Sequence, residues 1–421
     1  MRRLLSFVSC WLAVVALAQT PPVGPNPPPP LTSLTPEQRQ EVLSAIAVVL
    51  KERAFVPNID FSNWERIVAE RESEFNATDA VPAFVNNVNG IFRTYGISHI
   101  RLMGPVATAN YGRTTTIGVG IGAVVHRDGL LVRSVFATSP AGQAGIKEGD
   151  IILLVNGVKP EDPEALTGEA GEVLRLRLQR GSETLEIELT VAQFSTVRPE
   201  TLTWDGEIAV IRVWTFSTGY GRENLENLVK QAAGAKALII DVRRNGGGAS
   251  NNLHHLLSLL LPNETIYGTF LSRRIVDQYR AAHGQADTVD LIEVAKWTEA
   301  KVRTRERGVA AFTGPIAVLT DRGSGSASEI FAAAMRENAG ALLVGQPTAG
   351  AVLASVRARL PHGFSMQYPI SDFVTARGVR LEKAPLQPDL LVPSGDNESV
   401  MLAATTRLRS LLRQRESAGG Q

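Results

Sequence analysis

Apolar residues recur at helical spacing near the start of this chain. The spacing predicts helices at 35–53, 63–75 and 80–95. The first helix begins with a threonine, a proline and an acid at 35–37, where threonine caps the helix and proline fits the first helical position. The sequence therefore predicts an N-terminal helical segment, which we place at 35–113.

The pattern changes twice after this segment. From 114 to 195, short β-rich runs separated by glycines indicate a β-domain. Beyond residue 196, apolar strands alternate with helices, so we predict an α+β multidomain protein with an α/β core at 196–415. A polar, helix-prone insertion at 272–310 is either a lid or a solvated face. The expected core strands lie at 208–213, 237–241, 316–320 and 341–345, and the expected core helices at 221–233 and 399–413.

The first residues of the chain are basic and then apolar. Residues 1–18 carry two arginines, an apolar run and a small-x-small ending, the pattern of a secretory signal peptide cleaved before Gln19. The alternative is an uncleaved membrane anchor, although the run is short for a bilayer. Residues 19–34 are proline-rich and predict an extended linker. We therefore predict a secreted or periplasmic protein with no stable membrane anchor after cleavage.

Composition excludes several kinds of partner and site. Of 421 residues, 44% are hydrophobic and 20% are charged, and the formal net charge is +1. Losing Arg2 and Arg3 leaves 41 basic against 42 acidic residues, which argues against a nucleic-acid partner. Cys10, the only cysteine, lies in the signal peptide, so the mature chain has no disulfide and no thiolate site. The histidines lack metal-ligand spacing, and we expect no metal and no cofactor.

A serine-rich turn carries the strongest candidate chemistry. The stretch from Asp321 to Met335 reads D-R-G-S-G-S-A-S-E-I-F-A-A-A-M and joins the strand at 316–320 to a helix. A serine at such a turn can expose its hydroxyl beside the N–H groups of the helix N-terminus, as an acyl-transfer nucleophile requires. Serine is also a common helix cap, and the turn alone does not separate the two interpretations.

Two further stretches contain residues suited to catalysis. The helical segment ends in Ser98 and His99, and histidine is the commonest general base, which a neighbouring serine could orient. The alternative is a solvated or core-edge histidine. The strand at 237–241 opens into three glycines at 246–248, which form either a nest of N–H groups for an oxyanion or a purely structural turn.

A long glycine-punctuated block lies in the β-rich stretch. From Ser139 to Gly157 it reads S-P-A-G-Q-A-G-I-K-E-G-D-I-I-L-L-V-N-G and closely resembles a PDZ domain. PDZ domains bind extended C-terminal peptides by adding a strand to a sheet edge, and a glycine-rich loop holds the terminal carboxylate. The resemblance places the peptide-binding loop at Gly118, Val119, Gly120, Ile121 and Gly122.

The remaining motifs follow in a recognisable order. After the helices and the PDZ-like block come D-V-R-R-N-G-G-G at 241–248, S-G-S-A-S-E at 324–329 and G-Q-P-T-A-G at 345–350. In this order the chain resembles the C-terminal processing, or tail-specific, serine peptidase family. The resemblance implies an α/β peptidase core of the crotonase-like ββα type.

The same resemblance implies roles for single residues. It places the nucleophile at Ser326 and forms the oxyanion hole from the amide of Ala327 and that of Gly247 or Gly248. The common members of the family use a serine and a lysine, and the lysine position is Ala351 here. Alanine cannot accept a proton, so either the enzyme is inactive or another group is the base.

A second branch of the superfamily, the tricorn core protease, is similar to this chain where the first branch differs. That branch uses a histidine base held by an adjacent serine and by a glutamate late in the chain. Ser98, His99 and Glu382 stand in those places, with Glu382 ahead of the turn at 385–389. The resemblance implies that His99 takes the proton of Ser326 while Ser98 and Glu382 orient the imidazole ring.

Together these features predict an exported serine endopeptidase. Its expected partners are unfolded or C-terminally recognised proteins and peptides. The alternative is a catalytically inactive, PDZ-containing scaffold that binds a peptide or another ligand. Ala351 motivates this alternative, whereas Ser98, His99 and Glu382 argue against it.

Overall fold

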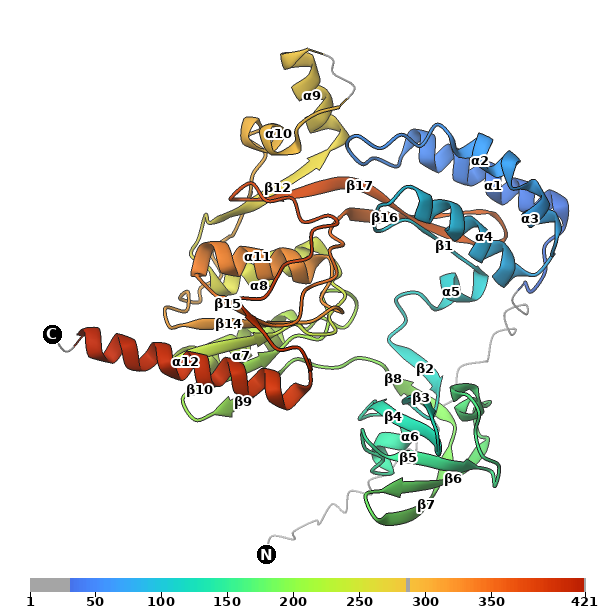
Figure 1. The fold of residues 1–421 in the computed structure, drawn as a ribbon, viewed down its shortest axis with the longest axis horizontal. Helices are drawn as coiled ribbons and strands as arrows, with labels where there is room; N and C mark the ends of the chain where they lie inside the picture. The colour runs from blue at the N-terminus through green and yellow to red at the C-terminus, as the bar shows by residue number, and fades with distance from the viewer. Residues whose placement is uncertain (1–30, 285–287, 420–421) are drawn as a thin grey trace, which may run out of the picture.

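The computed structural model describes residues 31–284 and 288–419 (Figure 1). The predicted signal peptide at 1–18 and most of the predicted linker at 19–34 lie outside these residues. Within the described ranges, no helix is both long and apolar enough to cross a membrane. The described chain has N-terminal helices, a β-rich domain and a mixed α/β core, as the sequence predicts.

The N-terminal segment is mostly helical. Its first helix starts where the sequence predicts, because the Thr35 hydroxyl accepts a hydrogen bond from Gln38 N at 3.2 Å and Gln38 Oε1 accepts one from Thr35 N at 2.9 Å. Pro36 occupies the first helical position, where its missing N–H costs nothing. The elements are α1 (Pro36–Glu52), α2 (Trp64–Glu70), α3 (Glu72–Asn76), α4 (Val81–Thr94), β1 (Arg101–Met103) and α5 (Pro105–Asn110).

The helical stretch predicted at 63–75 is present, but it is divided into two short helices, α2 and α3. Arg71 has φ −109° and ψ 16°, outside the helical region, and separates α2 from α3. The second helix is stabilised by packing. Phe75 is buried, and its ring centroid lies 5.8 Å from that of Phe84 on α4.

The helices cover an antiparallel sheet with the strand order β1-β17-β12-β13, in which β16 also pairs with β17 (Figure 1). Buried side chains of α1 and α4, such as Ile46 and Val88, belong to the same apolar core as Met366 of β17. This packing places the end of α4 and the residues before β1 beside the core domain. The remaining strands of the sheet are β12 (Ile266–Ser272), β13 (Val302–Arg303), β16 (Ala354–Arg359) and β17 (Ser365–Thr375).

The β-rich domain is built on a five-stranded antiparallel sheet with the order β3-β4-β5-β6-β7. Strand β3 lies at the edge of this sheet. A two-stranded ribbon of β2 and β8 connects the domain to the rest of the chain (Figure 1). The elements are β2 (Thr115–Gly118), β3 (Ile121–His126), β4 (Gly129–Val135), α6 (Pro140–Gln143), β5 (Ile151–Val155), a 3-10 helix (Pro163–Leu166), β6 (Val173–Arg180), β7 (Glu183–Thr190) and β8 (Ala192–Ser195).

The core domain contains a six-stranded sheet with the order β18-β15-β14-β11-β10-β9, parallel except for β9. Helices α7, α8 and α11 pack on one face and α12 on the other. Because the parallel strands end at the same edge, the loops after β10, β11 and β14 lie together. The elements are β9 (Thr201–Asp205), β10 (Ile208–Arg212), α7 (Arg222–Gln231), a 3-10 helix (Ala232–Gly234), β11 (Ala237–Asp241), α8 (Ser250–Leu260), β14 (Ile316–Thr320), α11 (Ala327–Ala339), β15 (Leu342–Gly345), a 3-10 helix (Pro361–Gly363), β18 (Leu390–Leu391) and α12 (Asn397–Gly419).

The insertion predicted at 272–310 contains two helices, α9 (Arg273–His283) and α10 (Leu291–Trp297). Both pack on the antiparallel sheet, since Val276, Val294 and Val374 share one small apolar core. The described part of the insertion is therefore fixed to the sheet by buried side chains.

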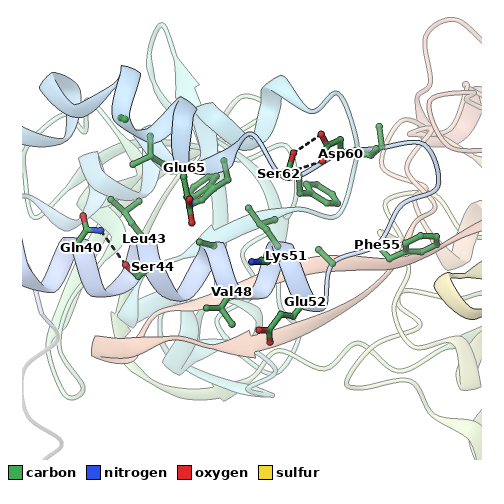
Figure 2. Close-up of a pocket in the computed structure, with 18 of the residues that line it drawn as sticks. Gln40, Leu43, Ser44, Val48, Lys51, Glu52, Phe55, Asp60, Ser62 and Glu65 are labelled. Atoms are coloured by element: carbon green, nitrogen blue, oxygen red, sulfur yellow. Dashed lines mark hydrogen bonds between the residues drawn. The ribbon is translucent and has the colours of Figure 1, made fainter. Parts of the chain in front are cut away.

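A groove of about 1260 Å³ runs along α1 and the segment that follows it. Figure 2 shows Val48, Lys51 and Glu52 on one side and Asp60 and Glu65 on the other. None of the candidate catalytic residues lines it. The groove is therefore separate from the serine-rich turn.

Burial along α1 generates a stability prediction. Ile46 is fully buried, whereas Val48 on the same helix is 47% exposed. We expect Ile46→Ala to lower the free energy of unfolding by about 2–5 kcal/mol, because it leaves a cavity between the helices and the sheet. The control Val48→Ala should change it by less than about 0.5 kcal/mol. Urea unfolding followed by circular dichroism measures both, and equal effects would contradict the packing described for α1.

Candidate active site

The serine-rich turn lies at the carboxyl end of β14 and leads directly into α11. Ser326 immediately precedes the helix and has φ 55° and ψ −119°, a conformation that non-glycine residues rarely adopt. Backbone strain of this kind costs of order 1–3 kcal/mol and persists only where surrounding contacts enforce it. The turn therefore holds the Ser326 backbone in one conformation.

The three serines of the turn have different surroundings. Ser324 and Ser328 are fully buried, and their hydroxyls donate to backbone carbonyls, Ser324 to Val242 at 2.9 Å and Ser328 to Asn245 at 2.7 Å. Both hydrogen bonds therefore hold the turn against the segment that leads into the three glycines. Ser326 is only partly buried, and its Oγ lies 3.2 Å from His99 Nε2.

His99 belongs to a distant part of the chain, between α4 and β1. The neighbouring Ile97 and Ile100 pack against the apolar core of the helical segment and so fix the position of this loop. His99 has φ 58°, again in the left-handed region. The structure thus brings together Ser326 and His99, whose positions in the sequence differ by 227.

Ser98 and Glu382 extend this contact into a continuous series of hydrogen bonds. Ser98 Oγ lies 2.7 Å from His99 Nδ1 and 2.8 Å from Glu382 Oε2. Because the serine has one proton and a carboxylate can only accept, Ser98 donates to Glu382 and accepts from Nδ1–H. This assignment leaves His99 Nε2 unprotonated and facing the Ser326 hydroxyl.

Glu382 is buried and accepts from three donors. Besides the Ser98 hydroxyl, its carboxylate accepts from Ser98 N at 2.8 Å and from Val352 N at 3.0 Å. A buried carboxylate needs such donors, because it has lost the hydrogen bonds of water. Glu382 therefore connects the histidine loop to the segment that follows β15.

The surroundings of His99 favour its neutral form. Burial is the largest influence and lowers the pKa of His99; the negative charge of Glu382 raises it and the positive charge of Arg101 lowers it. The net effect is a pKa below the ordinary value of 6.5. At neutral pH the imidazole can therefore accept a proton.

The candidate oxyanion donors lie around the same turn. Ala327 is the first residue of α11, so its N–H has no acceptor within the helix. The Cα of Gly247 packs so closely that an added Cβ would lie 2.7 Å from Ser326 Cβ, but its N–H donates to Asn245 Oδ1 at 3.0 Å. Gly248 is more exposed, and its N–H has no hydrogen bond within residues 31–284 and 288–419. The two glycines thus remain alternative second donors.

Sequence reasoning gave Glu329 no role, although it stands three residues after Ser326. Its side chain is completely buried beneath the turn and accepts from Ser326 N at 3.1 Å and from Ala351 N at 2.8 Å. Burial raises the pKa of Glu329, an effect that its hydrogen bonds with Thr348 and with backbone N–H groups oppose. The Ser-x-x-Glu spacing of a helix capping box, from Ser326 to Glu329, is the signal in the sequence that could have pointed to its contact with Ser326 N.

Ala351 lies directly beside the nucleophile turn. Its carbonyl accepts from Ser326 N at 2.8 Å. The methyl group of alanine offers no base, whereas the imidazole of His99 lies within hydrogen-bond reach of Ser326 Oγ, at 3.2 Å.

The predicted peptide-binding loop joins β2 to the edge strand β3. Val119 is buried, so its side chain belongs to the core of the β-rich domain rather than to a ligand surface. The carbonyls of Val119 and Gly120 accept from Ala141 and Phe136, which fixes the loop. The edge of β3 remains unpaired within its sheet.

No metal site accompanies these residues in the described chain. Within residues 31–284 and 288–419, no three His, Cys, Asp or Glu side chains gather closely enough to hold a metal ion.

Comparison with known families decides the relationship. Residues 207–392 match the model of peptidase family S41, and residues 118–191 match that of the PDZ domain. The stretch 207–392 therefore belongs to peptidase family S41. The chain also carries a PDZ domain, and its S41 stretch contains Ser326 and Glu382 but not His99.

Relatives of this chain include C-terminal processing proteases. It is 24% identical over 302 residues to a probable CtpA-like serine protease of Staphylococcus haemolyticus, covering 70% of this chain and 56% of the relative. It is 27% identical over 315 residues to a carboxyl-terminal-processing protease of Picosynechococcus, covering 71% and 69%. The chain thus spans little more than half of the staphylococcal relative.

The fold of this chain is similar to that of the tricorn protease. The superposition has a TM-score of 0.51 at 15% sequence identity and covers 89% of this chain but 37% of the tricorn chain. At this identity the likeness concerns the fold alone.

The electrostatics of His99 can be tested by titration. We expect NMR to give His99 a pKa below 6.5 and Arg101→Gln to raise that pKa, because the substitution removes a cation that disfavours imidazolium. The same substitution at Arg113, outside the site, should leave it unchanged. A wild-type pKa above 6.5, or a fall in Arg101→Gln, would contradict the assignment of the charges.

Proposed function

We propose that this chain is a serine endopeptidase whose nucleophile is Ser326 and whose general base is His99. The observation that carries the proposal is the unbroken series of hydrogen bonds from Glu382 through Ser98 and His99 to Ser326, with separations of 2.8, 2.7 and 3.2 Å. Nucleophile, base and orienting groups within hydrogen-bond reach are the signature of an activated serine. The substrate class is a peptide or an unfolded protein.

The proposed mechanism begins with proton transfer. His99 Nε2 accepts the proton of the Ser326 hydroxyl as Oγ attacks the peptide carbonyl carbon. Ser98 accepts a hydrogen bond from Nδ1–H, and its own proton faces Glu382, so the ring keeps the required tautomer. The buried negative charge of Glu382 also stabilises the imidazolium that forms.

The tetrahedral intermediate places negative charge on the former carbonyl oxygen. The Ala327 N–H, together with that of Gly247 or Gly248, would bind this oxygen. His99 then donates its proton to the leaving amine, and the peptide bond breaks to leave an acyl-enzyme on Ser326. A water molecule, deprotonated by the same histidine, hydrolyses the ester and restores the serine.

Substrate recognition is assigned to the PDZ domain. The edge of β3 and the glycine-rich loop before it are suited to an extended peptide with a free C-terminus. We further propose that the protein acts after export, in a periplasmic or extracellular space, since residues 1–18 have the pattern of a signal peptide.

The second candidate function is that of a non-catalytic binding scaffold. Ala351 favours it, because the base of the Ser-Lys relatives is missing. The position of His99 argues against it, since a scaffold has no need of an oriented imidazole 3.2 Å from a strained serine.

A fluorophosphonate probe distinguishes the two functions. We expect the wild-type protein to be labelled, Ser326→Ala to be unlabelled, and His99→Ala to react about 10²- to 10⁴-fold more slowly, the usual contribution of a general base. His283→Ala is the matched control, because this histidine is exposed at the end of α9. Labelling rates are measured on protein whose folding is verified by circular dichroism.

Two outcomes would overturn the proposal. Failure of folded wild-type protein to react would favour the scaffold. Equal labelling rates for His99→Ala and wild type would leave Ser326 reactive but remove His99 as its base.

A further inference from the structure

Glu329 is a buried carboxylate outside the proposed catalytic series of Glu382, Ser98, His99 and Ser326. Its side chain is completely inaccessible, and both carboxylate oxygens face hydrogen-bond donors. Oε1 accepts from Thr348 Oγ1 at 2.6 Å and from Gly350 N at 2.7 Å. Oε2 accepts from Ala351 N at 2.8 Å and from Ser326 N at 3.1 Å. One side chain thus ties the nucleophile turn to the segment 348–351.

The partners of these bonds favour an ionised carboxylate, whereas burial opposes it by raising the pKa of Glu329. Three partners are backbone N–H groups, which can only donate. The fourth, the Thr348 hydroxyl, accepts from Leu386 N at 2.8 Å and keeps its own proton to donate to Glu329. A neutral amide in place of the carboxylate would turn an NH₂ group toward at least one of these donors and leave buried donors unpaired.

The segment after β15 lies between two carboxylates. Glu329 holds the N–H groups of Gly350 and Ala351, and Glu382 holds the next one, Val352, at 3.0 Å. Glu329 also contacts Ser326, and Glu382 also contacts Ser98. The two carboxylates therefore connect the nucleophile turn to the histidine loop through one short stretch of backbone.

We propose that Glu329 is a positioning residue, which holds segment 348–351 against the nucleophile turn and thereby sets the separation of Ser326 and His99. This inference rests on the proposed peptidase function. It assigns to this segment the task of positioning the reacting groups, because its Ala351 supplies no base. In this role Glu329 acts on the reacting groups only through the backbone that it holds.

The test uses substitutions at the two side chains of this contact, Glu329 and Thr348. Glu329→Gln keeps the shape but loses the charge, and Thr348→Val removes one donor while Thr348→Ser retains it. The fraction of competent sites is counted with the fluorophosphonate probe at saturation, and kcat and KM are measured on a peptide substrate per labelled site. Glu337→Gln, the same change at the far end of α11, is the control.

We expect kcat per labelled site to fall about 10- to 100-fold in Glu329→Gln, with KM nearly unchanged, because a misplacement of about 1 Å can have this effect. Thr348→Val should lose part of kcat and Thr348→Ser should restore it. A merely structural role would lower the melting temperature or the fraction labelled but leave kcat per site intact, and that result would overturn the inference. If Glu329→Gln does not fold, the comparison of Thr348→Val with Thr348→Ser decides the question, again by kcat per labelled site.

Failure of the inference differs from failure of the proposed function. If wild-type protein is labelled and cleaves the peptide while the Glu329 and Thr348 variants keep wild-type kcat per site, the peptidase proposal stands and the positioning role is wrong. If wild-type protein neither reacts nor cleaves, both are wrong.

Discussion

A buried carboxylate must be satisfied by hydrogen-bond donors, and the candidate site depends on two such carboxylates, Glu382 and Glu329. Glu382 gathers donors from Ser98 and Val352, and Glu329 gathers them from Ser326, Thr348, Gly350 and Ala351. Without these donors, the free-energy cost of burying each carboxylate would be far larger than the net contribution of any single hydrogen bond. The two acids therefore hold in place the backbone that carries the candidate catalytic side chains.

The fold brings the candidate catalytic residues together from distant parts of the chain. His99 comes from the helical segment, Ser326 from the end of a parallel strand, and Glu382 from the chain after β17. Packing of α1 and α4 on the antiparallel sheet carries the histidine loop to the edge where the parallel strands end. The strained conformations of His99 and Ser326 persist because buried contacts on either side enforce them. Stability of the helical segment is thus a condition for the geometry of the site.

Much of this arrangement could be predicted from the sequence, for identifiable reasons. Continuous apolar runs such as 316–320 predicted the parallel strands, and the order of motifs indicated the S41 region and the PDZ domain. The motifs also singled out Ser98, His99, Ser326 and Glu382, which the structure brings together. The break at Arg71 was missed because the helical pattern continues across it. The role of Glu329 was missed because three of its four partners are backbone amides, which leave no trace in residue type. The choice between Gly247 and Gly248 depends on where two adjacent N–H groups point, which glycine spacing cannot encode.

The role proposed for His99, that of base for Ser326, is tested most directly by a crystal structure of the wild-type protein after reaction with a small fluorophosphonate. We expect phosphorus bonded to Ser326 Oγ and His99 Nε2 within about 3.5 Å of that oxygen. We also expect a phosphonyl oxygen that accepts a hydrogen bond from Ala327 N. Modification of Ser324 or Ser328, or an imidazole turned away from Ser326, would contradict the proposal.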